Sequence, residues 1–146
     1  MNIVIDTNVA VSGLLWGGPP NQILKWARDK RIRVPACKKT IDEFERVIRY
    51  PKFSSRLSAL EIDPQRVLSY FHDLITYMPI PDSIPAIIEA DPFDDLFLAL
   101  ALASHARLII SGDKHLLDLK TYQNIQIVTP SEGVAVILRL KEKLKR

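Results

Sequence analysis

Four acidic side chains stand at positions from which they could act together on one substrate: Asp6, Glu43, Asp95 and Asp113. Asp6 and Asp113 each come just after a short apolar run that is typical of a buried strand. Glu43 and Asp95 fall in the first turns of expected helices. Carboxylates that converge without basic partners repel one another, so they stay together only when a cation is bound. Oxygen ligands without His or Cys favour Mg²⁺ or Mn²⁺, and one or two such ions promote phosphodiester hydrolysis.

Each acid also has a structural explanation that involves no ligand. Glu43 could close a capping box, and Asp95, with Asp94 beside it, could complement the dipole of a helix. Asp113 could serve only as a turn residue. Asp6 is the hardest to explain in this way, because a charge directly after a buried strand needs a partner. The joint placement of the four acids, rather than any one of them, favours a shared metal site.

The elements that must position these acids alternate along the chain. Strands are expected at 2–6, 33–36, 108–111 and 125–128, and helices at 21–30, 40–50, 64–75, 92–103, 114–119 and from 130 into the C-terminal tail. The helix starts depend on the caps Thr40, Asp63, Asp91 and Thr129. Segment 7–20, which contains Gly17-Gly18-Pro19-Pro20, is expected to be turn and loop with room for one helical turn, and 78–85 a connector with room for a short strand.

The clearest strands are apolar throughout, which indicates a parallel sheet covered on both faces. The 146 residues suit one domain, so the sequence predicts a single three-layer α/β/α sandwich over 1–146, with a central, mostly parallel sheet. Right-handed crossovers place the carboxyl ends of such strands along one edge, where ligand sites form. Asp6 and Asp113 should therefore share that edge.

The distribution of charge is uneven. Residues 25–56 carry eleven Lys or Arg against four Asp or Glu, residues 61–95 carry one against eight, and the tail at 139–146 carries five against one. This pattern is compatible with a polyanion held beside an acidic site, although charge alone favours solvated helix faces. If a polyanion does bind, the basic residues at 25–39 are expected to contact its phosphates, with Lys38 and Lys39 as named candidates and the tail as a further option.

Several protein classes are excluded. The one cysteine, Cys37, leaves no internal disulfide and no cysteine-based zinc site, which fits a cytoplasmic location. No apolar run approaches the roughly 20 residues that a membrane span needs, and the N-terminus has no basic signal-peptide region. His72, His105 and His115 have no ligand spacing.

Four segments, taken in order, resemble the motifs of PIN-domain nucleases: Ile5–Val9, Thr40–Val47, Asp91–Ala101 and Ile109–Leu117. The resemblance extends from Met1 to about Val128. It is closest to the VapC-like toxin components of bacterial and archaeal toxin–antitoxin pairs. It implies the PIN-like variant of the Rossmann-like sandwich expected above.

The resemblance also implies a role for particular residues. It makes Asp6, Glu43, Asp95 and Asp113 the catalytic and metal-binding acids, with one or two Mg²⁺ or Mn²⁺ ions as cofactors. Asp94 is the alternative to Asp95 as the direct ligand, or else supports it. Thr7, Asn8 and Ser111 match the small polar residues that orient the site, and many members have threonine in place of Ser111.

The activity that the resemblance implies is hydrolysis of single-stranded RNA, which leaves 5′-phosphate and 3′-hydroxyl ends. The implied partners are the RNA substrate, a cognate antitoxin and a second copy of the chain in a homodimer. The apolar residues of the helices at 21–30 and 67–75 are expected to offer more hydrophobic surface than one sheet face needs, which favours such a dimer.

Two other functions remain open. One is a non-catalytic RNA-binding or regulatory protein on the same fold, although all four acids are retained. The other is a phosphotransfer or phosphatase domain with Asp6 as nucleophile. Such enzymes usually have a second acid two residues after the first, where this chain has Asn8.

Overall fold

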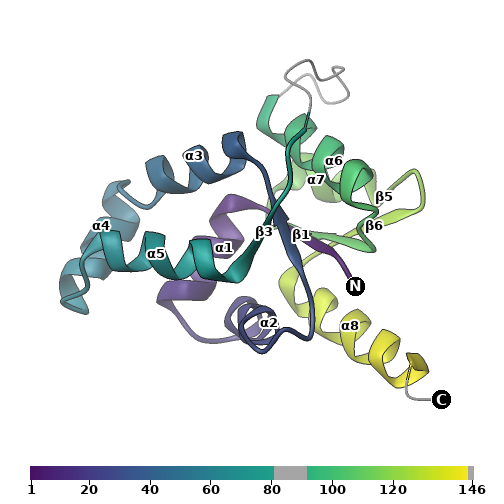
Figure 1. Cartoon of the computed structure of the whole chain (residues 1–146), viewed down its shortest axis with the longest axis horizontal. Coiled ribbons are helices and arrows are strands. Elements are labelled where there is room, and N and C mark those ends of the chain that lie inside the picture. Colours follow the sequence, from purple (N-terminus) through teal and green to yellow (C-terminus); the bar gives the residue numbers. More distant parts are fainter. Residues whose placement is uncertain (81–91, 145–146) are drawn as a thin grey trace.

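A computed structural model describes residues 1–80 and 92–144, in which strands alternate with helices (Figure 1). The strands are β1 (Ile3–Ile5), β2 (Val34–Ala36), β3 (Ile75–Tyr77), β4 (Leu108–Ile110), β5 (Thr121–Tyr122) and β6 (Ile125–Val128). The helices are α1 (Thr7–Leu15), α2 (Pro19–Arg28), α3 (Lys38–Val47), α4 (Pro51–Ala59), α5 (Pro64–Leu74), α6 (Pro92–Ser104), α7 (Lys114–Leu119) and α8 (Pro130–Leu144).

The sheet is mostly parallel, as the apolar strands predict. Strands β1, β4 and β6 are parallel neighbours in the order β1-β4-β6-β5, and only the short β5 joins antiparallel. Strands β2 and β3 form a separate parallel pair, which a parallel bridge between Asn2 and Arg33 places beside β1. The carboxyl ends of all these parallel strands therefore point to one edge, which begins with Asp6 after β1 and Ser111 after β4.

The sheet is covered on both faces, because successive side chains of a strand point to opposite sides. Ile3 and Ile5 belong to one core cluster with residues of α1, α2, α5 and α8. Val4, between them, belongs to a second cluster with residues of α6 and α7. The predicted three-layer α/β/α sandwich is thus confirmed. Helices α3, α4 and α5 extend from it as an arm on the left of Figure 1.

The loop expected after the first strand is wrong, because α1 occupies Thr7–Leu15. Asp6 begins this helix by accepting a hydrogen bond from the Val9 N–H at 2.9 Å. Gly13 lies inside the helix, where a Cβ would come within 2.8 Å of the Pro20 carbonyl oxygen. The glycine therefore permits the close approach of α1 and α2, and the breaker residues act only after α1 has ended.

Further boundaries differ from the expectation, and α2 spans Pro19–Arg28 instead of 21–30. Helix α3 begins at Lys38, because the Thr40 hydroxyl accepts from the Cys37 N–H at 2.9 Å and so marks the third helical residue, not the cap. Helix α3 ends at Val47, before the expected end near Tyr50, and Pro51 begins α4, which was not anticipated. Ile75 was expected in a helix but begins β3. The short β5 was also missed, and the other expected elements are confirmed.

Two expectations lie outside the described residues, namely the Asp91 cap and most of the connector at 78–85. In the described part of the chain, no helix combines the length and the apolar character needed to cross a membrane. The basic tail continues α8 as far as Leu144.

The expected surplus of apolar surface on two helices is wrong. Ile23 and Leu24 of α2 and Phe71 of α5 are buried within the single chain. They are covered because α2 packs against α1, α5 and α8. These residues therefore give no argument for a dimer.

Candidate active site

Asp6 is fixed at the junction of β1 and α1 by hydrogen bonds from two directions. Its N–H donates to the Ile110 carbonyl at 2.9 Å, which extends the β1–β4 pairing by one residue. Carboxylate Oδ1 accepts from the Val9 N–H at 2.9 Å. Oδ2 accepts from the Ser111 hydroxyl and, at 3.3 Å, from the Gly112 N–H. The residues that follow β4 thus hold the carboxylate of Asp6, which follows β1.

The charged form of Asp6 is disfavoured in this position. Only 6% of the residue is exposed, and burial raises the pKa of its carboxyl above the ordinary value. The charge of Asp113 raises this pKa further, whereas the three hydrogen bonds partly offset the rise. Within the described residues, every donor to this carboxylate is neutral. A cation at this place would therefore favour ionised Asp6.

Ser111 connects Asp6 with Asp113. Its hydroxyl donates to Asp6 and accepts from the Asp113 N–H at 2.9 Å, and the residue is completely buried. The Asp113 carboxylate accepts from the His115 N–H at 2.7 Å and so caps α7. Asp113 therefore does serve as a turn residue, as one explanation proposed. The same turn also brings its negative charge close enough to Asp6 to raise the pKa of Asp6.

Glu43 is held by the residue that follows Asp6. The Thr7 hydroxyl, on a side chain only 7% exposed, donates to Glu43 Oε2 at 2.7 Å. Glu43 lies in the second turn of α3 and not, as expected, in the first. It does not close a capping box with Thr40, because Thr40 bonds to Cys37 instead. The contact with Thr7 places Glu43 on the side of the Asp6 edge.

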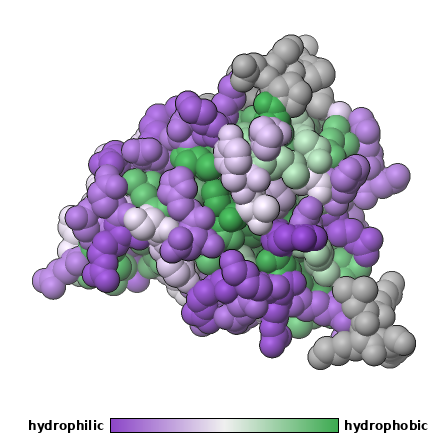
Figure 2. Space-filling view, viewed as in Figure 1, coloured by the Kyte–Doolittle hydropathy of each residue, from purple (hydrophilic) through white to green (hydrophobic). Residues whose placement is uncertain are grey.

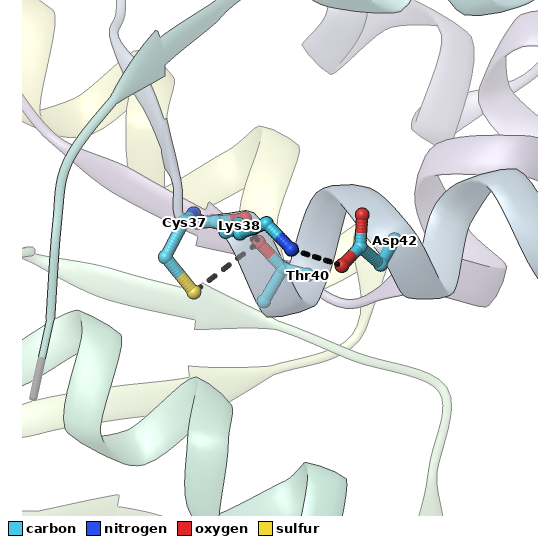
Figure 3. Close-up of polar contacts among 4 residues, drawn as sticks. All are labelled: Cys37, Lys38, Thr40 and Asp42. Atoms are coloured by element: carbon cyan, nitrogen blue, oxygen red, sulfur yellow. Dashed lines mark hydrogen bonds and ion pairs between the residues drawn. The ribbon is translucent and has the colours of Figure 1, made fainter. Parts of the chain in front are cut away.

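The start of α3 is shown in Figure 3, where Thr40 reaches back to Cys37 and Lys38 extends to Asp42. The Lys38 ammonium lies 3.5 Å from Asp42 Oδ2, and both side chains are largely exposed. Lys38 and Lys39 occupy the first two positions of the helix. The two ammonium groups are repelled by the positive end of the helix dipole, and a bound anion would offset this repulsion.

Asp95 lies in the first turn of α6, as expected, and is only 6% exposed. Helix α6 packs against β1, β2 and β4. Nothing is described for the side chain of Asp94. Asn8, next to Thr7 in α1, is exposed, and its side chain makes no hydrogen bond within the part of the chain that the structure describes.

The carboxylate oxygens at this edge are suitable ligands for a hard cation, although those of the described residues do not form a complete metal site. Over residues 1–80 and 92–144, no three Asp, Glu, His or Cys side chains gather closely enough to hold an ion as one group. The donor type is nevertheless right for Mg²⁺ or Mn²⁺, because carboxylate oxygens are their preferred protein ligands. Buried Asp6, with only neutral donors and a second acid nearby, is the observation that fits such an ion.

Two contributors to this edge were missed by the sequence analysis. The Gly112 N–H donates to Asp6, and a backbone donor of this kind leaves no side-chain signal beyond the Ser-Gly-Asp turn. Tyr77 ends β3 and is 61% exposed. It was missed because segment 64–75 was expected to be helical, so no strand of the sheet was expected to end at Tyr77.

A protein-family model described as PIN domain matches residues 2–115. The chain therefore belongs to the PIN domain family, whose members are generally metal-dependent nucleases. The matched region contains Asp6, Glu43, Asp95 and Asp113. No curated protein matches the chain.

Proposed function

We propose that this PIN domain is a metal-dependent endoribonuclease that hydrolyses single-stranded RNA. The observation that carries the proposal is the buried carboxylate of Asp6, which neutral donors hold near the charge of Asp113. A buried carboxylate that has only neutral donors and lies near a second negative charge destabilises the folded chain unless a cation binds it. The family match over residues 2–115, a range that includes these acids, supports nuclease chemistry.

In the proposed site, Asp6, Glu43, Asp95 and Asp113 hold one or two Mg²⁺ or Mn²⁺ ions, with Asp94 as the alternative to Asp95. Bound ions of this kind activate a water molecule and stabilise the charge on the leaving oxygen. Ser111 and Thr7 orient two of the acids through their hydroxyl groups. Lys38 and Lys39 are exposed at the start of α3, where they can contact phosphates of the RNA.

The phosphotransfer alternative is less well supported by the local geometry. Asn8 stands where a second acid would be needed and is exposed. A non-catalytic RNA-binding protein on this fold is the other alternative, and a cleavage assay separates it from the nuclease.

The test uses an end-labelled, unstructured RNA with Mg²⁺, with Mn²⁺ or with EDTA. We expect metal-dependent cuts with 5′-phosphate ends, no cuts in EDTA and almost none by Asp6→Asn or Asp113→Asn. The matched control is Asp73→Asn, which removes an exposed acid of α5. Binding of RNA without cleavage under every metal condition would favour the non-catalytic protein. Stable phosphate attached to Asp6 would favour phosphotransfer.

The proposed biological role is that of a cytoplasmic toxin with a cognate antitoxin. Induced expression of the chain should then arrest growth, and Asp6→Asn should abolish the arrest. Co-expression of a small neighbouring reading frame should restore growth if it encodes the antitoxin. Growth arrest that persists with Asp6→Asn would contradict a nuclease toxin.

We also propose a homodimer, which the exposed side chains around α4 support. Trp16 contacts Phe53 of α4, and Tyr50 and Leu60 lie at the two ends of that helix. Trp16, Tyr50 and Leu60 are all large and exposed. Sedimentation at micromolar concentration that shows only monomer, with and without Mg²⁺, would contradict the dimer.

A further inference from the structure

Tyr77 is an exposed aromatic side chain at the end of an outer strand. It pairs with Ala36 of β2, and the next residue, Met78, donates its N–H to the Ala36 carbonyl at 2.8 Å. The backbone around Tyr77 is thus held by the sheet, while 61% of the residue is exposed. No hydrogen bond joins its hydroxyl to another described residue. The sheet therefore fixes the place from which the ring projects, while the ring itself does little for the packing of the fold.

Tyr77 lies at the same edge of the sheet as the candidate active site. Strand β3 neighbours β2, and β2 lies beside β1, so one strand separates the ends that carry Tyr77 and Asp6. At about 4.8 Å between neighbouring strands, these two strands are roughly 10 Å apart. Helix α3 connects the two places, because it carries Lys38 and Lys39 at its start and Glu43 further along.

Two hollows in the surface meet at Tyr77. One has a volume of about 400 Å³ and is lined by Lys38, Ile41, His72, Ile75 and Tyr77. The other, of about 390 Å³, also includes Tyr77 and Lys38 and adds Lys39. Figure 2 shows hydrophobic residues that reach the surface between α3 and α5, beside β3. Hollows of this size accommodate a group as large as a nucleotide.

The combination of an aromatic ring, an apolar floor and two lysines matches the chemistry of a single nucleic-acid strand. Bases stack on aromatic rings whatever their sequence, and lysines neutralise the phosphates between them. The ion pair of Lys38 with Asp42 does not oppose this, because an exposed pair contributes little and a phosphate can replace the carboxylate. A duplex has its bases already stacked and offers none to the ring.

We propose that Tyr77 stacks on an unpaired base of the RNA strand whose phosphodiester lies at the Asp6 edge, with Lys38 and Lys39 on the intervening phosphates. The inference rests on the proposed function, since it assigns a position to the same substrate. It makes Tyr77 a binding residue that selects single strands over duplexes. It does not give Tyr77 a part in bond cleavage.

The test measures the affinity of a short, fluorescent, unstructured RNA in EDTA, where no cleavage occurs. We expect Tyr77→Ala to weaken binding by about 5- to 150-fold, the range that base–aromatic stacking gives on alanine substitution. Tyr77→Phe should keep the affinity of the parent, because the ring and not the hydroxyl makes the contact. The matched control is Tyr70→Ala, which removes an exposed tyrosine of α5 that lines neither hollow. Thermal melts establish that each variant is folded.

A set of RNAs with one abasic site at successive positions identifies the stacked base. At that position the losses from the abasic site and from Tyr77→Ala should not add, because both remove the same stacking interaction. Additive losses of affinity at every position, or a Tyr77→Ala variant that binds as tightly as the parent, would overturn the inference. If the parent still cleaves RNA in that case, the proposed nuclease function stands. A parent that neither binds nor cuts RNA would overturn the proposed function and the inference together.

Discussion

The Ser111 hydroxyl donates a hydrogen bond to the Asp6 carboxylate, although 105 positions separate the two residues in the sequence. Strand β4 lies parallel to β1 with Ile110 opposite Ile5, so the residues that follow these strands are neighbours at the edge of the sheet. The same hydroxyl accepts from the Asp113 N–H. One buried side chain therefore sets the position of two acids of the proposed site.

Replacing Ser111 by Ala should affect the ionisation of Asp6. The hydrogen bond from Ser111 lowers the pKa of Asp6, so its loss should raise that pKa further. The acidic limb of the cleavage pH profile should then move to higher pH. Loss of a hydrogen bond to a charged group should also cost about 1.5–3 kcal/mol of stability at neutral pH. The measurements are the cleavage rate at a fixed, subsaturating Mg²⁺ concentration over a pH series and denaturant unfolding.

The control for this prediction is Ser111→Thr, which keeps the hydroxyl. It should retain the pH profile of the parent even if the added methyl group lowers the stability. An Ala variant that is destabilised but keeps the parent's profile would restrict Ser111 to a structural role.

Thr7 should be needed for the position of Glu43 and not only for the packing of α1. Thr7→Val keeps the shape but removes the hydroxyl that donates to Glu43 Oε2. We expect Mn²⁺ affinity to fall by about 10- to 100-fold, as for other residues that orient metal ligands. Thr7→Ser should stay close to the parent. Calorimetric titration with Mn²⁺ gives both affinities, and equal values for the Val and Ser variants would show that the hydroxyl does not matter.

The stability of the metal-free protein should fall as pH rises because of Asp6. Burial and the charge of Asp113 raise its pKa in the folded chain above that of the unfolded chain. Between these two pKa values the folded chain holds a proton that the unfolded chain has released, so the free energy of unfolding decreases with pH. The loss is complete above the folded pKa and absent below the unfolded one.

Denaturant unfolding in EDTA over this pH range checks the prediction. Asp6→Asn should flatten the decrease, although its amide introduces a donor opposite the Gly112 N–H and so lowers the stability at every pH. Mn²⁺ should restore stability to the parent at the upper end of the range, because it binds the folded state. An identical pH dependence in the parent and in Asp6→Asn would exclude Asp6 as its cause.

The elements with strong local patterns could be predicted from the sequence, and those that depend on distant contacts could not. Apolar runs located β1, β4 and β6, and the edge shared by Asp6 and Asp113 followed from their parallel pairing. Helix α1 was missed because its cap is Asp6, which sequence analysis had assigned only to chemistry. The approach of Thr7 to Glu43 depends on how α3 packs, which no local pattern reports.

Lys38 and Lys39 should contribute to RNA affinity and little to the cleavage step. They are exposed at the start of α3, so their replacement should mainly affect the binding of phosphates. For the double variant Lys38→Ala and Lys39→Ala we expect weaker binding and a salt dependence whose slope is smaller by about 1.4, or about 0.7 for each phosphate that a lysine no longer neutralises. Binding at a series of salt concentrations measures the slope. Cleavage at saturating RNA should keep the parent's rate, and an unchanged slope would make these lysines a solvated surface.

Replacing Asp95 by Asn should show whether this residue binds a metal ion or only stabilises α6. As a metal ligand, it places a negative charge close to the other acids, which opposes folding when no metal is bound. Asp95→Asn keeps the shape and removes that charge together with one oxygen ligand of the proposed ion. We therefore expect most cleavage activity to be lost and Mg²⁺ or Mn²⁺ to bind more weakly. The metal-free melting temperature should stay level or rise, and the increase on adding Mn²⁺ should shrink.

The opposite pattern is expected if Asp95 only complements the dipole of α6, in whose first turn it lies. The variant would then lose about 0.3–1 kcal/mol of stability and keep its activity. Asp94→Asn is the matched comparison, because it removes a neighbouring charge from the same turn of the helix. Melting curves with and without Mn²⁺, beside one RNA cleavage assay, distinguish the two roles. An Asp95→Asn variant that is less stable but fully active, together with an inactive Asp94→Asn, would move the metal ligand to Asp94.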